Sequence, residues 1–245
     1  MMYAYFMKGT SGPPQLTLCL PKRRVKRRRK PGRKRAADSK DPVHRVRESL
    51  KPGNAVHTIL RVKADVGRLR RGPVLAALRR ALVVVGVKAD FRVVHFSIQH
   101  NHVHFLVEAT GASALSKGMQ AVAVSAARAI NRVMRRRGKV FAYRFHSTVI
   151  RSPRQARSCL AYVLNNWRRH CEDERSLEAR HCPVDPYSSA PSFPGWNQAL
   201  NLAALPGWGG FTPIPGAAPT TWLLREGWLR AGDPLDMWST PGPPH

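Results

Sequence analysis

Acidic side chains are scarce in this sequence, which contains 14 Asp and Glu residues against 42 Lys and Arg residues and has a formal net charge of +28. A chain this basic needs a polyanionic partner, and nucleic acid fits such a field best. Acidic membrane lipid is the weaker alternative, because no amphipathic anchor accompanies the charge. The composition therefore favours a nucleic-acid-binding protein.

Long apolar runs and closely spaced cysteines are missing as well. No apolar run approaches the length that spans a membrane, so we expect no membrane partner. The cysteines show no Cys-x-x-Cys spacing, which argues against a disulfide framework and a zinc ribbon; they are Cys19, Cys159, Cys171 and Cys182. The short apolar opening precedes its positive charges, the reverse of a secretory signal, and we therefore expect a cytoplasmic protein.

Charge and composition divide the chain into three regions. Residues 1–41 hold 13 basic and 2 acidic side chains, and the run from Lys22 to Arg35 is almost entirely basic, which predicts a disordered basic arm. Residues 42–170 hold 25 basic and 4 acidic side chains, so the positive field belongs mainly to this region and favours a nucleic-acid surface built into a fold. Residues 171–245 are rich in Pro and Trp, and we expect them to wrap around the core of the middle region.

The apolar periodicity of residues 42–170 predicts the order β-α-β-β-α-β followed by one more helix. This order is typical of an α+β protein with the ferredoxin-like split βαβ plan. We expect an antiparallel sheet with two helices on one face and the other face open to a ligand. The expected strands lie at 56–62, 91–99, 102–107 and 143–150, and the expected helices begin at Pro73, near Leu115 and at Pro153, the last of them running to about Arg169.

The third predicted strand contains a pair of histidines. His102 and His104 fall on one face of it, because successive side chains of a strand alternate between faces, whereas Val103, Phe105 and Val107 fall on the other. Two histidines at this spacing can converge on one metal ion or phosphate. The alternative is a pair of surface histidines on the open face of a half-buried sheet.

The last predicted helix carries a tyrosine and an amide on one side. Tyr162 falls off the apolar stripe of this helix, and Asn166 lies one turn later on the same side. A half-buried tyrosine with an ordinary polar neighbour is the alternative, since tyrosines are common at core edges. The stripe itself consists of Ala156, Leu160, Val163, Leu164 and Trp167.

These residues carry a resemblance to a known family. His102-Val103-His104 resembles the HUH strand (His, hydrophobic, His) of single-tyrosine transposases of the insertion-sequence type. Three further segments follow in the order found in the branch called REP-associated tyrosine transposases, and they are Leu115 to Gln120, Arg144 to Ser147 and Ala161 to Asn166. The resemblance covers about residues 43–170 and implies the same ferredoxin-like fold.

The resemblance implies a metal-dependent endonuclease and strand-transferase that acts on single-stranded DNA. Tyr162 would attack a phosphodiester and form a 5′-phosphotyrosine, which retains the transfer potential for rejoining. His102 and His104, with Asn166 as third ligand, would hold Mg²⁺ or Mn²⁺. The implied partners are hairpin-containing DNA and a second copy of the chain in a homodimer, with no small-molecule cofactor. DNA would then place the protein at the nucleoid.

Six further residues are candidates for contacts with DNA, with a sheet-face histidine or a solvated helix face as the ordinary alternative: His57, Lys117, Gln120, His146, Arg168 and Arg169. Two other functions remain open. One is a catalytically inactive or domesticated relative that binds structured single-stranded DNA or RNA, and the other is a ribosome-associated or RNA-binding protein of the same architecture. Among these, the transposase alone requires Tyr162, both histidines and a divalent ion together.

Overall fold

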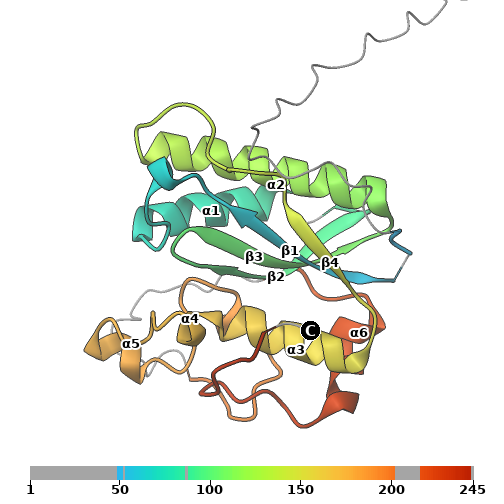
Figure 1. The fold of residues 1–245 in the computed structure, drawn as a ribbon. Coiled ribbons are helices and arrows are strands. Elements are labelled where there is room, and N and C mark those ends of the chain that lie inside the picture. Colours follow the sequence, from blue (N-terminus) through green and yellow to red (C-terminus); the bar gives the residue numbers. More distant parts are fainter. Residues whose placement is uncertain (1–48, 52, 86–87, 202–215, 244–245) are drawn as a thin grey trace, which may run out of the picture. The chain divides into compact units, whose positions relative to one another are not determined.

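A computed structural model describes residues 49–51, 53–85, 88–201 and 216–243 (Figure 1). The chain groups into two units, Met1–Lys40 and Asp41–His245. The first unit, and with it the predicted disordered arm, lies outside the described residues. In the part that is described, no helix is both long and apolar enough to cross a membrane.

Four strands form one antiparallel sheet in the order β2-β3-β1-β4. The strands are β1 (Ala55–Arg61), β2 (Phe91–Ile98), β3 (His102–Ala109) and β4 (His146–Ile150). Helix α1 (Gly72–Val85) connects β1 to β2, and α2 (Ala112–Val133) connects β3 to β4. The predicted ferredoxin-like order and strand arrangement are therefore confirmed.

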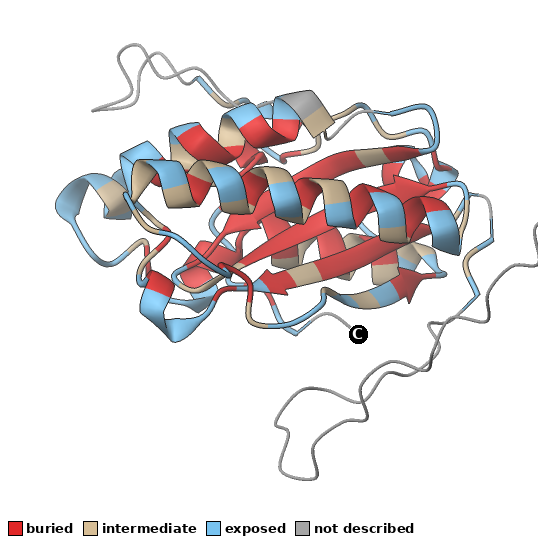
Figure 2. Cartoon of the chain, turned by 90° about the horizontal axis from the view of Figure 1, so that it is seen from above, coloured by how far each residue is buried: buried red, intermediate tan, exposed pale blue. Residues whose placement is uncertain are grey.

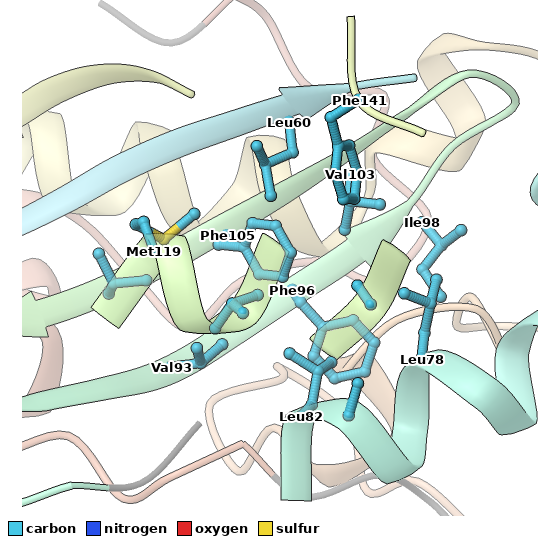
Figure 3. Close-up of a cluster of buried hydrophobic side chains, with 14 of the residues drawn as sticks. Leu60, Leu78, Leu82, Val93, Phe96, Ile98, Val103, Phe105, Met119 and Phe141 are labelled. Atoms are coloured by element: carbon cyan, nitrogen blue, oxygen red, sulfur yellow. The ribbon is translucent and has the colours of Figure 1, made fainter. Parts of the chain in front are cut away.

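One face of the sheet packs against α1 and α2, which lie side by side over the strands (Figures 1 and 2). Alternate strand residues such as Leu60, Val103 and Phe105 point into this layer, where they meet Leu78 of α1 and Met119 of α2 (Figure 3). Each fully buried apolar side chain of this size stabilises the fold by about 1.5–3 kcal/mol relative to exposure. The period-two pattern of the strands thus accounts for the first core.

The opposite face of the sheet is also covered, and the prediction of an open face is wrong. Helix α3 (Pro153–Leu164) and residues of the C-terminal region form a second core with Ala55, Val94 and Leu106 of the sheet (Figure 1). Short elements of this layer are α4 (Asn166–Arg169), α5 (Leu177–His181), α6 (Trp222–Arg225) and the 3₁₀ helices at Ala190–Ser192 and Gly227–Ala231. The apolar stripe of α3 needed a partner, and this sheet face supplies it.

Buried ion pairs and charge-assisted hydrogen bonds attach the C-terminal region to the loop before α1 and to strand β3. Arg70 binds Asp185 through two hydrogen bonds of 2.8 and 2.9 Å, and both side chains are buried. The carboxylate of Glu108 accepts hydrogen bonds from the backbone N–H and the hydroxyl of both Thr220 and Thr221. Losing one partner of such a pair leaves a buried charge uncompensated. These contacts therefore hold the covering layer in place.

Two element boundaries differ from the predictions. Strand β4 begins at His146 instead of residue 143, because the chain bends at residues 142–144. The helix expected to run to Arg169 stops at Leu164 and restarts at Asn166. Asn165 lies at the break, and its side-chain amide donates to the carbonyls of Asp236 and Ser239. A long-range contact with the C-terminal region therefore accompanies the interruption.

Candidate functional site

Three histidines from two neighbouring strands meet on the α3 face of the sheet. His102 and His104 lie on β3, and His57 lies on β1, which pairs with β3 in an antiparallel register. The Nε2 atoms of His102 and His104 are 2.8 Å apart. Nδ1 of His104 lies 3.0 Å from Nε2 of His57. The three imidazoles therefore form a chain with His104 in the middle.

Burial keeps these imidazoles neutral. It lowers the pKa of His57 and of His102 to about 4 each. Repulsion between protonated forms adds to the effect, from His146 and His102 on His57 and from His170 and Arg61 on His102. Burial and the neighbouring histidines also hold the pKa of His104 well below 6.5. Neutral imidazole is the form that binds a metal ion. At neutral pH the histidines are therefore ready to act as ligands.

Asn101 orients the ring of His102. Its side-chain oxygen lies 2.8 Å from Nδ1 of His102. Because an amide oxygen only accepts hydrogen bonds, Nδ1 must carry the proton, and Nε2 has a free lone pair. The ring planes of His102 and His104 are inclined by 80°, with centroids 4.6 Å apart. Their two Nε2 atoms therefore converge from different directions, as two ligands of one ion do.

Tyr162 lies directly over this histidine chain. Its ring centroid is 5.2 Å from that of His104 and 5.9 Å from that of His57, with ring planes inclined by 89° and 73°. Burial raises the pKa of the Tyr162 phenol above 10, and the positive charge of Arg169 acts in the opposite direction. The phenol is therefore protonated at neutral pH. The sequence pattern placed this tyrosine off the core stripe, and tertiary packing brings it to the histidines.

Asn166 is buried, and both of its side-chain amide atoms lack a hydrogen-bond partner among the described residues. A buried amide without partners costs free energy, so such a group calls for an explanation. The sequence placed Asn166 one turn after Tyr162 on a continuous helix. The break at Asn165 means that a turn between α3 and α4 sets their relative orientation instead.

Gln99, which the sequence pattern did not single out, is a polar residue next to His102 at the end of β2. It is buried, and its Oε1 atom has no partner in the described part of the chain, while its Nε2 atom donates to Ser97. Its backbone N–H donates to the carbonyl of His102 across the β2–β3 turn. The sequence could have indicated this residue, because Gln99 follows Ser97 by two positions and therefore shares its strand face. Two unpartnered amide groups thus belong to this layer.

The donor set fits a weakly held divalent ion. No group of three or more His, Cys, Asp or Glu side chains is arranged to hold a metal ion within the described ranges. Two imidazole nitrogens from His102 and His104, with the amide oxygen of Asn166, make an incomplete set that leaves positions for water or phosphate. The unpartnered amide of Asn166 is consistent with such a role. Mg²⁺ or Mn²⁺ as the ion at this site stays a prediction.

The six other predicted residues fall into different places. His57 is buried in the histidine chain, His146 is exposed on β4 near it, and Arg169 is exposed near Tyr162. Arg168 is buried and bonds to the carbonyls of Cys182, Pro183 and Met237 and to Asp173. Lys117 and Gln120 are exposed on α2, which lies across the sheet from Tyr162 (Figure 1). Contact with DNA stays a prediction for all six.

A basic segment lies next to the histidine end of the sheet. Residues 109–171 contain 13 Lys and Arg residues and no Asp or Glu. The segment that follows α2 is hydrogen-bonded to the end of β1 and the residues just after it. The backbone N–H of Lys63 donates to the carbonyl of Val140, and the backbone N–H of Ala142 donates to the carbonyl of Arg61. Arg61 pairs in turn with His102. The basic residues at the end of α2 and just after it are Arg132, Arg135, Arg136, Arg137 and Lys139, and they are called the basic segment below.

Residues 52–166 match the sequence model of a protein family described as "Transposase IS200 like". The matched stretch extends to the first residue of α4 and contains His102, His104 and Tyr162. The match covers a little under half of the chain, and this part of the protein is similar to IS200-like transposases.

Two solved structures are similar to the chain. One is that of a REP-associated tyrosine transposase bound to a REP hairpin, with 16% identity, a TM-score of 0.45, and coverage of 73% of this chain and 93% of that one. The other is a candidate transposase from Deinococcus radiodurans R1, with 14% identity, a TM-score of 0.32, and coverage of 56% of this chain and 99% of that one. No curated protein matches the chain.

Proposed function

We propose that this protein is a transposase that cuts and rejoins single-stranded DNA through a 5′-phosphotyrosine at Tyr162, with a divalent metal ion held beside it. One observation carries the proposal. The Tyr162 ring lies 5.2 Å from the ring of His104, whose Nε2 atom meets that of His102 at 2.8 Å. A nucleophile and two metal ligands, from elements far apart in the sequence, thus occupy one buried face.

The metal would be Mg²⁺ or Mn²⁺, held by His102, His104 and Asn166. When bound, it would polarise the scissile phosphate and stabilise the charge that develops on the phosphate oxygens. Because His102 and His104 are neutral, each can direct an Nε2 lone pair at the ion without releasing a proton to solvent. Asn166 would contribute an oxygen that has no partner among the described residues.

Tyr162 would supply the nucleophilic oxygen. A bond forms between the tyrosine oxygen and phosphorus, the bond to the 3′ oxygen breaks, and the phenol proton balances the proton that the leaving 3′ oxygen gains. Because burial raises the pKa of Tyr162, the phenol is a poor nucleophile on its own. Arg169 favours the phenolate as the proton leaves. The phosphotyrosine ester keeps the transfer potential, so a second 3′-hydroxyl can reverse the reaction.

The DNA partner follows from the charge and the family. The stretch without acidic residues, 109–171, contains Tyr162 and Asn166, and its basic segment adjoins the strand end that carries Arg61. Phosphate groups bind such a surface largely independently of base sequence. We propose single-stranded DNA with a hairpin as the substrate, and a homodimer as the acting species.

Purified protein incubated with labelled single-stranded oligonucleotides from the flanks of its own gene tests this function. With Mn²⁺, denaturing electrophoresis should show a covalent adduct, which EDTA and Tyr162→Phe abolish. Tyr143→Phe is the matched control, because Tyr143 is an exposed tyrosine of the same domain, and it should retain the adduct. Tight binding of complete flanks without any adduct would overturn the proposal in favour of an inactive nucleic-acid-binding relative.

A further inference from the structure

We propose that His57 is a positioning residue that fixes the tautomer and the ring orientation of His104. Its effect on metal affinity rests on the metal site proposed above, whereas the hydrogen bond between the two rings does not. His57 is 3% exposed and His104 is 1% exposed, so neither ring is solvated enough for water to take over this contact.

The contact between the two rings is an in-plane hydrogen bond. Nε2 of His57 and Nδ1 of His104 are 3.0 Å apart, the ring planes are inclined by only 17°, and the centroids are 5.2 Å apart. That centroid separation is close to the nitrogen–nitrogen distance plus the two ring radii. The rings therefore lie edge to edge, with the donor and acceptor directed at each other, instead of face to face.

The neighbouring contacts determine which nitrogen carries each proton in the metal-free protein. Nδ1 of His102 donates to Asn101, so Nε2 of His102 accepts. Nε2 of His104 must then be the donor across the 2.8 Å contact with His102, which leaves Nδ1 of His104 as an acceptor. Nε2 of His57 must therefore be protonated and donate to it. Each of the three contacts thus holds one proton.

An ion held by the Nε2 atoms of His102 and His104 requires a different distribution of the same protons. Nε2 of His104 must give up its proton, and Nδ1 must take one. Nδ1–H of His104 then donates to Nε2 of His57, whose proton moves to its own Nδ1. Three rings carry three protons before and after, so no proton is released.

His57 is thus the acceptor that a metal-bound His104 requires. Metal-binding histidines generally donate their second ring N–H to a fixed acceptor, and losing that acceptor weakens metal binding 10–100-fold. His57 is not itself a ligand in this arrangement, because its Nε2 atom faces Nδ1 of His104, on the other side of that ring from the atom that meets His102.

Two substitutions separate this role from simple filling of space. In His57→Gln, the amide Oε1 can take the place of Nε2 and accept from His104. In His57→Leu, the side chain fills the site but accepts nothing. His95→Leu is the matched control, since His95 is a buried histidine of β2 that contacts Ser189 instead of the histidine chain.

Two measurements on the full chain test the role of His57. Long-range ¹H–¹⁵N NMR of histidine-labelled protein should show Nε2–H on His104 without metal and Nδ1–H after addition of Mg²⁺. Titration with Mn²⁺ should show about 10–100-fold weaker binding in His57→Leu. His57→Gln and His95→Leu should bind close to wild type.

The outcomes of the two proposals are distinguishable. Wild-type protein that binds no Mn²⁺ would overturn the metal site, while the NMR of metal-free protein still reports on the His57–His104 bond. Wild-type protein that binds Mn²⁺ no more tightly than His57→Leu does, or that keeps Nε2–H on His104 with Mg²⁺ bound, would overturn the role of His57. If His57→Leu does not fold, wild type and His57→Gln decide the question.

Discussion

The ring of Tyr162 stands perpendicular to the ring of His104, with an interplanar angle of 89° and a centroid separation of 5.2 Å. The two residues come from α3 and β3. His104 also contacts His57 and His102, so one buried imidazole contacts the proposed nucleophile, the proposed second ligand and the positioning residue. A change at any of these neighbours should therefore be felt at His104.

Asn101 should affect metal binding although it is not a proposed ligand. Asn101→Leu removes the acceptor for Nδ1–H of His102, and the ring can then place its proton on Nε2, the atom needed for the metal. We expect Mn²⁺ affinity to fall by about 10-fold or more, and Asn101→Asp to retain it, because a carboxylate also accepts. Titration with Mn²⁺ measures the affinity of both variants. Equal affinity in wild type and Asn101→Leu would contradict the proposed orientation of the His102 ring.

Metal-free protein should lose stability as the pH falls below 6.5. Burial lowers the pKa of His57 from 6.5 to about 4, so the unfolded chain binds a proton there at a higher pH than the folded protein does. The folded protein has its full stability from this group above pH 6.5 and loses it as the pH falls toward 4. At pH 5, linkage predicts that the free energy of unfolding is about 2 kcal/mol lower than at neutral pH because of His57 alone. Urea unfolding between pH 8 and pH 5 should be less pH-dependent in His57→Gln. Identical pH dependence in the two proteins would refute the shift.

The basic segment should contribute more to DNA binding than the start of α2 does. Replacing Arg132, Arg137 and Lys139 by Gln should reduce the salt dependence of single-stranded DNA binding, by up to about 0.7 in the log–log slope for each phosphate that the protein no longer neutralises. Lys117→Gln is the comparison, since Lys117 lies 16 residues before the end of α2 at Val133, or roughly 24 Å along the helix axis. A larger effect of Lys117→Gln would show that DNA follows α2 instead.

Gly118→Ala should destabilise the fold. An added Cβ at this position of α2 would overlap the ring of buried Phe91, whereas one at Gly111 would meet nothing within 4 Å. Overpacking of this kind costs about 1–3 kcal/mol, which offsets the gain in helix propensity of about 1 kcal/mol. The free energy of unfolding in urea should therefore fall in Gly118→Ala and stay near wild type in Gly111→Ala. Unchanged stability of Gly118→Ala would mean that α2 can shift at little cost.

Local sequence pattern was sufficient for the order of strands and helices along the chain and for part of the site. Alternation along residues 102–109 places His102 and His104 on the same strand face, and the apolar stripe of α3 leaves Tyr162 off it. These conclusions need only the period of one strand or one helix. The family match over residues 52–166 covers the same elements.

Long-range packing decided the rest. The second face of the sheet is covered, α3 breaks at Asn165, and His57 faces His104, and each of these depends on segments far apart in the chain. A single strand shows which face His57 occupies, but the register between β1 and β3 determines which side chain it meets. Side-chain periodicity is a property of one element, whereas contacts between elements are set by the burial and hydrogen bonding of the whole fold.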